Sequence, residues 1–199
     1  YRLFRLGVSY SPGGHLRFEG FDVDQSAPDT GIRTIEAYAD RLEVRDVTID
    51  GFHDSGTWGP GMFNVTDPDG YGIVERFRAP DGGAWIDNTP NAGNRWRGPI
   101  GIEANQNVGT LEFRHCWLGG FPNNGLYAAG GVGRIIVHGG WFRNSNGANV
   151  RVGGQGIGRD PGAQWVAARV NRVDHLPAGQ LFLIGQAVAV AVFAQGVGL

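Results

Sequence analysis

The chain of 199 residues contains no lysine and a single cysteine, Cys116. Its 17 basic residues are all arginines, which we ascribe to a GC-rich genome rather than to a mechanism. One cysteine excludes an internal disulfide, and its alignment with Val47 and Gly140, an inward position of the repeat described below, predicts a buried thiol rather than a nucleophile. The 19 acidic residues nearly balance the arginines, for a formal net charge of −2. Because no basic stripe or stacking platform appears, the composition argues against nucleic acid as a partner.

Helical periodicity and several site motifs are missing as well. No apolar stripe at helical spacing runs through the chain before residue 160. No spacing of His and Cys suggests zinc, and there is no adjacent Asp-Asp pair of the polygalacturonase kind. No signal peptide is visible. Residues 181–199 are uncharged, but the alternation over 187–192 is typical of a strand and does not favour a membrane anchor.

What the chain has is a repeated phrase. Residues 42–52 (LEVRDVTIDGF) return 69 positions later as 111–121 (LEFRHCWLGGF), with weaker copies at 16–24 and 135–142. Each copy alternates apolar and polar residues, which is typical of strands, and a short apolar element precedes it. Two or three short strands in about 24 residues correspond to one coil of a parallel β-helix. A β-sandwich is the main alternative, but a near-identical phrase at a coil-like offset favours the all-β solenoid.

The bends and the long gap complete the expected architecture. Glycine supplies 35 residues. Asparagines recur at one bend, either to bond along the coil axis or because turns tolerate them. They are Asn105, Asn107, Asn123, Asn124, Asn144 and Asn146. The 69-residue offset exceeds one coil by about 45 residues, so we expect a long loop at about 53–99, within which 71–77 has the pattern of a further strand. We predict β-helix coils over 1–156 and a divergent segment over 157–199, either a cap or a truncated solenoid.

Four phrases, which cover 51–59, 84–91, 119–128 and 146–154, resemble the right-handed parallel β-helix repeat proteins of extremely halophilic archaea. The resemblance covers roughly residues 14–156. It implies a right-handed helix with a pectate-lyase-like cross-section and an extracellular or cell-surface setting. It carries no activity that can be transferred residue by residue. The nearly neutral charge departs from the acidic composition usual in such proteins.

The 53–99 loop holds the richest polar cluster and three tryptophans, a combination typical of sugar binding. The residues that we expect to bind substrate are His53, Asp54, Trp58, Arg95 and Trp96. The catalytic candidates are Asp87 and Glu103 as carboxylates and Arg97 as the base of a lyase. Asp67 and Asp69 would supply oxygen ligands to Ca²⁺, although Asp-x-Asp-Gly is also an ordinary turn. The same loop also fits a solvated segment pinned by its own tryptophans.

Three functional hypotheses follow from these residues. The first is an extracellular carbohydrate-active protein, either a polysaccharide lyase or a glycoside hydrolase. The second is a non-catalytic cell-surface or adhesion module that binds glycans, and the third is a fragment of a larger solenoid without activity. His115 and His138 lie on the bend after the first apolar run, and we expect both to face outward without a catalytic role. The sequence does not predict an oligomeric state.

Overall fold

The computed structural model describes residues 2–55, 58–86, 98–153 and the backbone of 168–169. The strands are β1 (Arg2–Leu6), β2 (Gly13–Asp24), β3 (Arg33–Asp50), β4 (Gly61–Val65), β5 (Tyr71–Ala79), β6 (Ile102–Glu103), β7 (Thr110–Arg114), β8 (Trp117–Leu118), β9 (Asn124–Ala128), β10 (Arg134–His138), β11 (Trp141–Phe142), β12 (Ala148–Val152) and β13 (Ala168–Arg169). These ranges contain no helix, and therefore none with the length and apolarity to cross a membrane.

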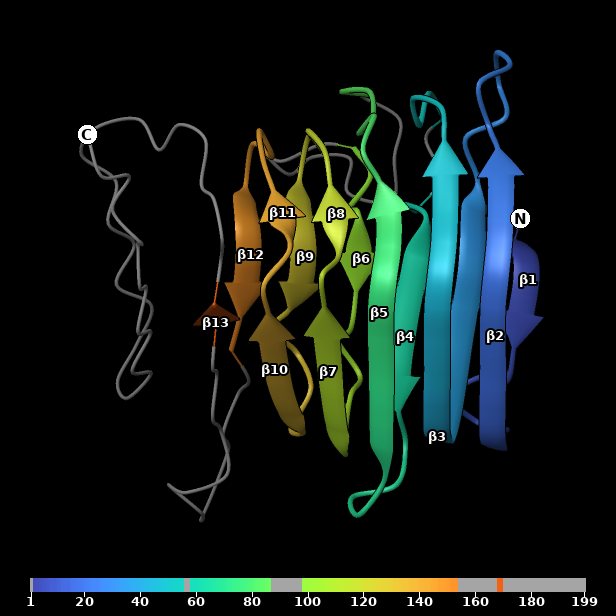
Figure 1. Ribbon diagram of the computed structural model, residues 1–199, viewed down its shortest axis with the longest axis vertical. Helices are drawn as coiled ribbons and strands as arrows, with labels where there is room; N and C mark the ends of the chain where they lie inside the picture. The colour runs from blue at the N-terminus through green and yellow to red at the C-terminus, as the bar shows by residue number, and fades with distance from the viewer. Residues whose placement is uncertain (1, 56–57, 87–97, 154–167, 170–199) are drawn as a thin grey trace.

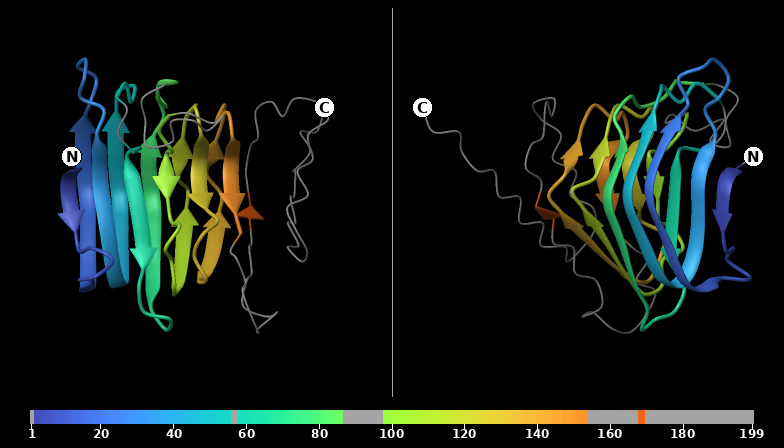
Figure 2. Two further views of the ribbon diagram at one scale, coloured as in Figure 1. Left: turned by 180° about the vertical axis from the view of Figure 1, so that it is seen from behind. Right: turned by 45° about the vertical axis from the view of Figure 1, so that its right-hand side comes forward.

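The strands stack as a parallel β-solenoid of about five turns (Figure 1), as the repeat predicts. One face consists of β1, the first half of β3, β4, β6, β9 and β12. The other consists of β2, the second half of β3, β5, β7 and β10, and β8 and β11 continue it beyond a bend. The second view in Figure 2 shows the two faces enclosing the interior. Every pairing between named strands is parallel, which excludes the antiparallel sandwich.

The 69-residue offset spans two coils rather than one. Leu42 pairs with Gly72, and Gly72 pairs with Leu111. The interval 53–99 is therefore not one loop, because β4 and β5 form a coil within it and the predicted strand over 71–77 is part of β5. The repeated phrase is not recognisable in this coil, because Gly72 occupies the position that Leu42 and Leu111 occupy in the two neighbouring coils. A Cβ at Gly72 would lie 2.7 Å from a methyl of Val65 and 2.9 Å from a methyl of Leu111, so a side chain there would require these neighbours to shift.

The interior is a continuous apolar core built from the inward residues of each coil. Leu42, Val44, Phe63 and Leu111 are fully buried. Cys116 belongs to this core, as its column in the repeat predicts, and burial raises the pKa of its thiol to about 12. The cysteine is thus protonated and enclosed, which agrees with a structural role.

The asparagines of the turns connect neighbouring coils. Buried Asn107 accepts a hydrogen bond from the backbone N–H of Val65 (2.9 Å) and donates to the carbonyl of Gly109 (2.7 Å). Asn105 accepts from the N–H of Ala129 in the next coil (3.3 Å). These side chains satisfy backbone groups that the turns leave unpaired, so they act along the coil axis through the backbone.

The second face bends at one position in every coil, and the residue there is left-handed. The φ angles are 74° at Gly20, 51° at Asp46 and Arg76, 52° at His115 and 57° at Gly139. The register aligns these five positions, so the bend forms a line along the solenoid. Three coils carry a side chain where L-residues are disfavoured.

Glycine in place of His115 should raise the free energy of unfolding by about 0.5–1 kcal/mol. The substitution removes the strain that the Cβ causes at a positive φ. The greater conformational freedom of glycine in the unfolded chain offsets only part of this gain. Valine at the same position should lower it, since a β-branched residue fits this region worst. Urea unfolding of the two variants measures both effects. A His115→Val protein as stable as wild type would contradict the assigned conformation.

Candidate functional site

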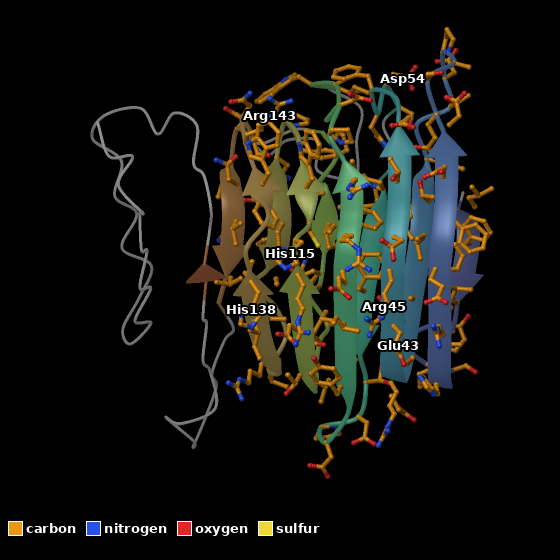
Figure 3. The ribbon with its side chains drawn as sticks, in the orientation of Figure 1. Glu43, Arg45, Asp54, His115, His138 and Arg143 are labelled. Carbon is orange, nitrogen blue, oxygen red and sulfur yellow. The ribbon has the colours of Figure 1, made fainter. Side chains whose placement is uncertain are left out.

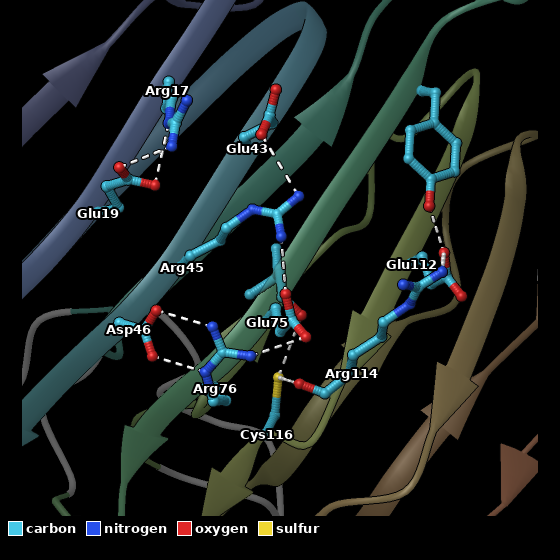
Figure 4. A network of polar contacts seen from close by, with 12 residues as sticks. Arg17, Glu19, Glu43, Arg45, Asp46, Glu75, Arg76, Glu112, Arg114 and Cys116 are labelled. Carbon is cyan, nitrogen blue, oxygen red and sulfur yellow. Dashed lines mark hydrogen bonds and ion pairs between the residues drawn. The ribbon is translucent and has the colours of Figure 1, made fainter.

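A ladder of charged side chains covers the outward side of β2, the second half of β3, β5, β7 and β10, which we call the outer face (Figure 3). The repeated LEVR and LEFR phrases produce it, because apolar residues point inward and the intervening charges align between coils. Arg45 bridges Glu43 (3.3 Å) and Glu75 (2.8 Å). Arg76 bridges Asp46 (2.6 Å) and Glu75 (2.8 Å), as Figure 4 shows. The hydrogen bond from Arg76 holds the pKa of Asp46 below its ordinary value.

At β7 the ladder gathers three residues around the carboxylate of Glu112, and we call these four residues the Glu112 cluster. Glu112 Oε2 accepts hydrogen bonds from the Tyr71 hydroxyl and from Arg114 Nη2 (2.7 Å). Its Oε1 lies 2.8 Å from His138 Nε2. Tyr71 comes from β5, Glu112 and Arg114 from β7, and His138 from β10, so three successive coils supply the cluster.

The cluster encloses its carboxylate and exposes its other members. Glu112 is 4% exposed, whereas Tyr71 is 44% exposed and the side chains of Arg114 and His138 are 41% and 48% exposed. A molecule on the outer face would therefore meet a phenol, a guanidinium and an imidazole. The carboxylate behind them holds all three in place.

The protonation states follow from these contacts. Burial raises the pKa of Glu112, but hydrogen bonds from Arg114 and Tyr71 outweigh it, and the pKa lies below the usual glutamate value. Burial and then the hydrogen bond to Glu112 raise the pKa of the Tyr71 phenol. Near neutral pH the glutamate is ionised and the phenol is protonated. Because ionised Glu112 can only accept, His138 donates to it through Nε2, and in the tautomer with its proton on Nε2 the Nδ1 atom is an acceptor.

Two of the predicted site residues, Glu103 and Trp58, lie on the other face of the solenoid. Both contact Arg33, which is part of a buried ion-pair cluster. Arg33 Nη2 donates to Glu103 (2.5 Å), Arg33 Nη1 lies 3.7 Å from Glu36, and the Arg33 guanidinium carbon lies 5.8 Å from the Trp58 ring centre. The side chains of Arg33, Glu36 and Glu103 are 2–6% exposed. Burial raises the pKa of Glu103, against the opposing effect of Arg33. This closed cluster holds β3 and β6 together and offers little surface to a substrate.

His53 and Asp54 occupy the turn that follows β3. His53 is buried and forms a bridge with Gly83 of the next coil. Asp54 accepts the backbone N–H groups of Asp29 (2.7 Å) and Gly31 (3.1 Å). The hydrogen bond from Asp29 is the main reason that the pKa of Asp54 is lowered. Both residues thus contact neighbouring turns.

Asp67 and Asp69 lie in the turn between β4 and β5, at the opposite edge of the strands from Asp54 (Figures 1 and 3). Asp67 Oδ1 accepts the N–H of Asp69 (2.9 Å), the contact of an ordinary Asx turn. In the described ranges no three His, Cys, Asp or Glu side chains gather as a metal site would require. Calcium binding at these aspartates stays a prediction.

The remaining predicted residues are Asp87, Arg95, Trp96 and Arg97, and all four lie outside the described residues. Trp85 is 52% exposed, whereas Trp58 lies beside buried Arg33. The described candidates therefore do not converge: Glu103 and Trp58 share one cluster, His53 and Asp54 share a turn, and the two aspartates are remote from both.

The residues of the Glu112 cluster were missed as site candidates. Aligning the repeated phrases places His138 in the column of Arg114, two positions from Glu112, so part of the cluster could have been found. Tyr71 could not, because its coil lacks the phrase. A scan of protein-family models matches none of them to this chain, and searches of curated proteins and of solved structures find no match either.

Proposed function

We propose that this protein is a carbohydrate-active β-solenoid that cleaves an acidic polysaccharide by β-elimination at the Glu112 cluster. The observation that carries the proposal is an ionised, buried carboxylate that positions an exposed imidazole, phenol and guanidinium on one face. The resemblance of the sequence to extracellular β-helix proteins supports a pectate-lyase-like cross-section and a cell-surface or secreted setting for such an enzyme.

Each exposed group has a role in eliminating across a uronate. Arg114 uses one N–H on Glu112 and has further donors for the uronate carboxylate, whose charge otherwise opposes loss of the neighbouring proton. Nδ1 of His138 takes the proton from the carbon next to that carboxylate, and Glu112 stabilises the imidazolium. The electron pair forms the carbon–carbon double bond as the glycosidic C–O bond breaks. Tyr71 donates its proton to the departing oxygen and becomes a phenolate. The His138 imidazolium then loses its proton to solvent, and solvent reprotonates the phenolate.

The coils before the cluster suit a polymer rather than a single sugar. Glu43, Arg45, Glu75 and Arg76 continue the charged ladder across β3 and β5. Paired guanidiniums and carboxylates offer donors and acceptors to the hydroxyl groups of neighbouring sugars. Neighbouring strands lie about 4.7–4.9 Å apart, so the charged pairs recur at a spacing roughly equal to the length of one sugar unit.

The test is a turnover screen on polyuronates and neutral polysaccharides, with Ca²⁺ and with chelator, that reads unsaturated ends and reducing ends separately. We expect unsaturated ends from a polyuronate, with kcat reduced at least about 100-fold in His138→Ala and in Tyr71→Phe. Matched controls are His15→Ala, which removes the equivalent pairing with Glu43 (3.1 Å), and Tyr10→Phe, at a residue that is 83% exposed. Reducing ends without unsaturation, or equal loss in the control variants, would contradict the proposed elimination.

A non-catalytic glycan-binding module is the second candidate. The favouring observation is that paired charges recur on β3, β5 and β7, whereas the Glu112 cluster occurs once. Calorimetric binding of a polysaccharide without turnover, weakened by Arg45→Gln but not by His138→Ala, would support this function over the enzyme.

A further inference from the structure

Beyond the bend, aromatic and cationic side chains take the place of the paired charges. Trp117 of β8 and Trp141 of β11 are partners in the parallel register, and their rings are stacked with centroids 4.6 Å apart and planes 26° apart. The guanidinium carbon of Arg143 lies 4.6 Å from the centre of the Trp141 ring. In the preceding coil, Arg78 of β5 is the register partner of Trp117. We call these four residues the Trp stack.

The arginines of the Trp stack differ from those of the charged ladder. Arg45, Arg76 and Arg114 each form an ion pair with a carboxylate. Within the part of the chain that the structure describes, no carboxylate lies within ion-pair distance of Arg78 or Arg143. The protein thus leaves two guanidiniums beside the tryptophans for an anion from outside.

The Trp stack also contains buried N–H groups without an acceptor. Nε1 of Trp117, Nε1 of Trp141 and Nε of Arg143 are enclosed, and none has a hydrogen-bond partner among the described residues. Buried polar groups are normally paired, and all three of these are donors only, so what they lack is an acceptor. The ring faces already contact each other and Arg143, which leaves little room for a sugar to stack on them. The chemistry that remains is hydrogen bonding to an oxyanion.

We propose that the Trp stack binds a carboxylate of the acidic polysaccharide that the Glu112 cluster cleaves. Arg78 and Arg143 supply the positive charge, and the two indole N–H groups supply further donors to the carboxylate oxygens. The identity of the ligand rests on the proposed function, whereas the donors and charges of the site do not.

Binding requires one side chain to move, because the unpaired N–H groups are enclosed in this structure. Arg143 is the least restrained member of the Trp stack. It is half-buried, and within the described ranges its guanidinium has the contact with Trp141 but no hydrogen bond. A carboxylate that pairs with this guanidinium draws it off the ring and gains access to the indole edges.

The position of the Trp stack suits a polymer that passes the Glu112 cluster. Trp117 follows Arg114 by three residues and Trp141 follows His138 by three, in the same two coils. About 10 Å of strand therefore separates the two sites, roughly the length of two sugar units. Figure 3 shows Arg143 near the end of β11, beyond His138. A uronate about two units from the bond that breaks would thus place its carboxylate at the Trp stack.

Calorimetry with an oligogalacturonate tests the site without turnover, in the full chain carrying His138→Ala. We expect Arg143→Gln and Trp141→Phe, each added to this background, to raise the Kd by about 10-fold. Trp141→Phe keeps an aromatic ring and removes only the indole N–H. The matched controls are Arg151→Gln, which removes a guanidinium lying 5.0 Å from the Tyr127 ring on the other face, and Trp85→Phe, at a tryptophan that is 52% exposed. Both controls should leave the Kd unchanged, and equal Kd values for Arg143→Gln and Arg151→Gln would overturn the site.

Two further measurements separate this inference from the proposed activity and from binding of free anions. If the wild type cleaves a polyuronate, Arg143→Gln should raise KM by about 10-fold and leave kcat unchanged, and an unchanged KM would overturn the site while the elimination stands. Binding that Arg143→Gln weakens, in a wild type without turnover, would keep the site and overturn the elimination. A response to inorganic sulfate that Arg143→Gln abolishes, with none to the oligogalacturonate, would overturn the assignment to a polysaccharide.

Discussion

Replacing Arg33 by alanine should lower the free energy of unfolding by about 3–5 kcal/mol. Arg33 is 2% exposed, and its guanidinium contacts Glu103 through Nη2 and lies 3.7 Å from Glu36 through Nη1. Both carboxylates are buried, so its loss leaves Glu103 without the partner that offsets its desolvation. The apolar stem of Arg33 is lost as well, and with it packing beside Trp58.

Urea unfolding with Arg41→Ala as an exposed control measures this effect, and the control should change stability by less than about 0.5 kcal/mol. The double variant Arg33→Ala/Glu103→Gln should be more stable than Arg33→Ala alone, because it removes the stranded charge. Burial raises the folded-state pKa of Glu103, so its ionisation disfavours the fold at high pH. The loss in Arg33→Ala should therefore shrink as the pH falls and Glu103 becomes protonated. A loss that grows on acidification would contradict this origin.

Alanine at Gly119 should cost about 3 kcal/mol or more, the upper end for overpacking. A Cβ there would lie 1.8 Å from the carbonyl oxygen and 2.5 Å from the carbonyl carbon of Pro80. Both atoms are backbone of the preceding coil, so no rotamer change relieves the contact. Gly119 also donates its N–H to Ala79 (2.9 Å), and separating the coils would break this hydrogen bond.

Gly14→Ala is the matched control, because no heavy atom lies within 4 Å of the Cβ that it would add. Its free energy of unfolding should stay within about 0.5 kcal/mol of wild type. Thermal and urea unfolding of the two variants compare the sites directly. If Gly119→Ala matched Gly14→Ala, the coils would not be as closely stacked there as the structure shows.

The fold could be predicted from the sequence because its repeat is visible in four of the coils. Alternation identified the strands around Leu42 and Leu111, and the 24-residue offset identified the coil. The coil of β4 and β5 was hidden because it departs from the phrase at Gly72, where a side chain would press on Val65 and Leu111. The close packing of the core at Gly72 thus explains why this coil lacks the leucine by which the repeat was recognised.

The site was harder to predict, because it depends on register between strands. Tyr71 is 41 positions from Glu112, and only the pairing of β5 with β7 brings them together. Arg33 and Glu103 are 70 positions apart, so nothing local indicates that the predicted carboxylate is engaged in a buried ion pair. Residue type identified Glu103 as a candidate, but strand pairing determines what it contacts.

One strand belongs to both faces. β3 runs for 18 residues without interruption, with β1 and β4 beside its first half and β2 and β5 beside its second. Opening this coil therefore requires the loss of four strand pairings together, whereas the short strands β8 and β11 can separate by losing few hydrogen bonds. We therefore expect the second coil to be the last part to open under tension, and its amides to exchange with solvent only on global unfolding.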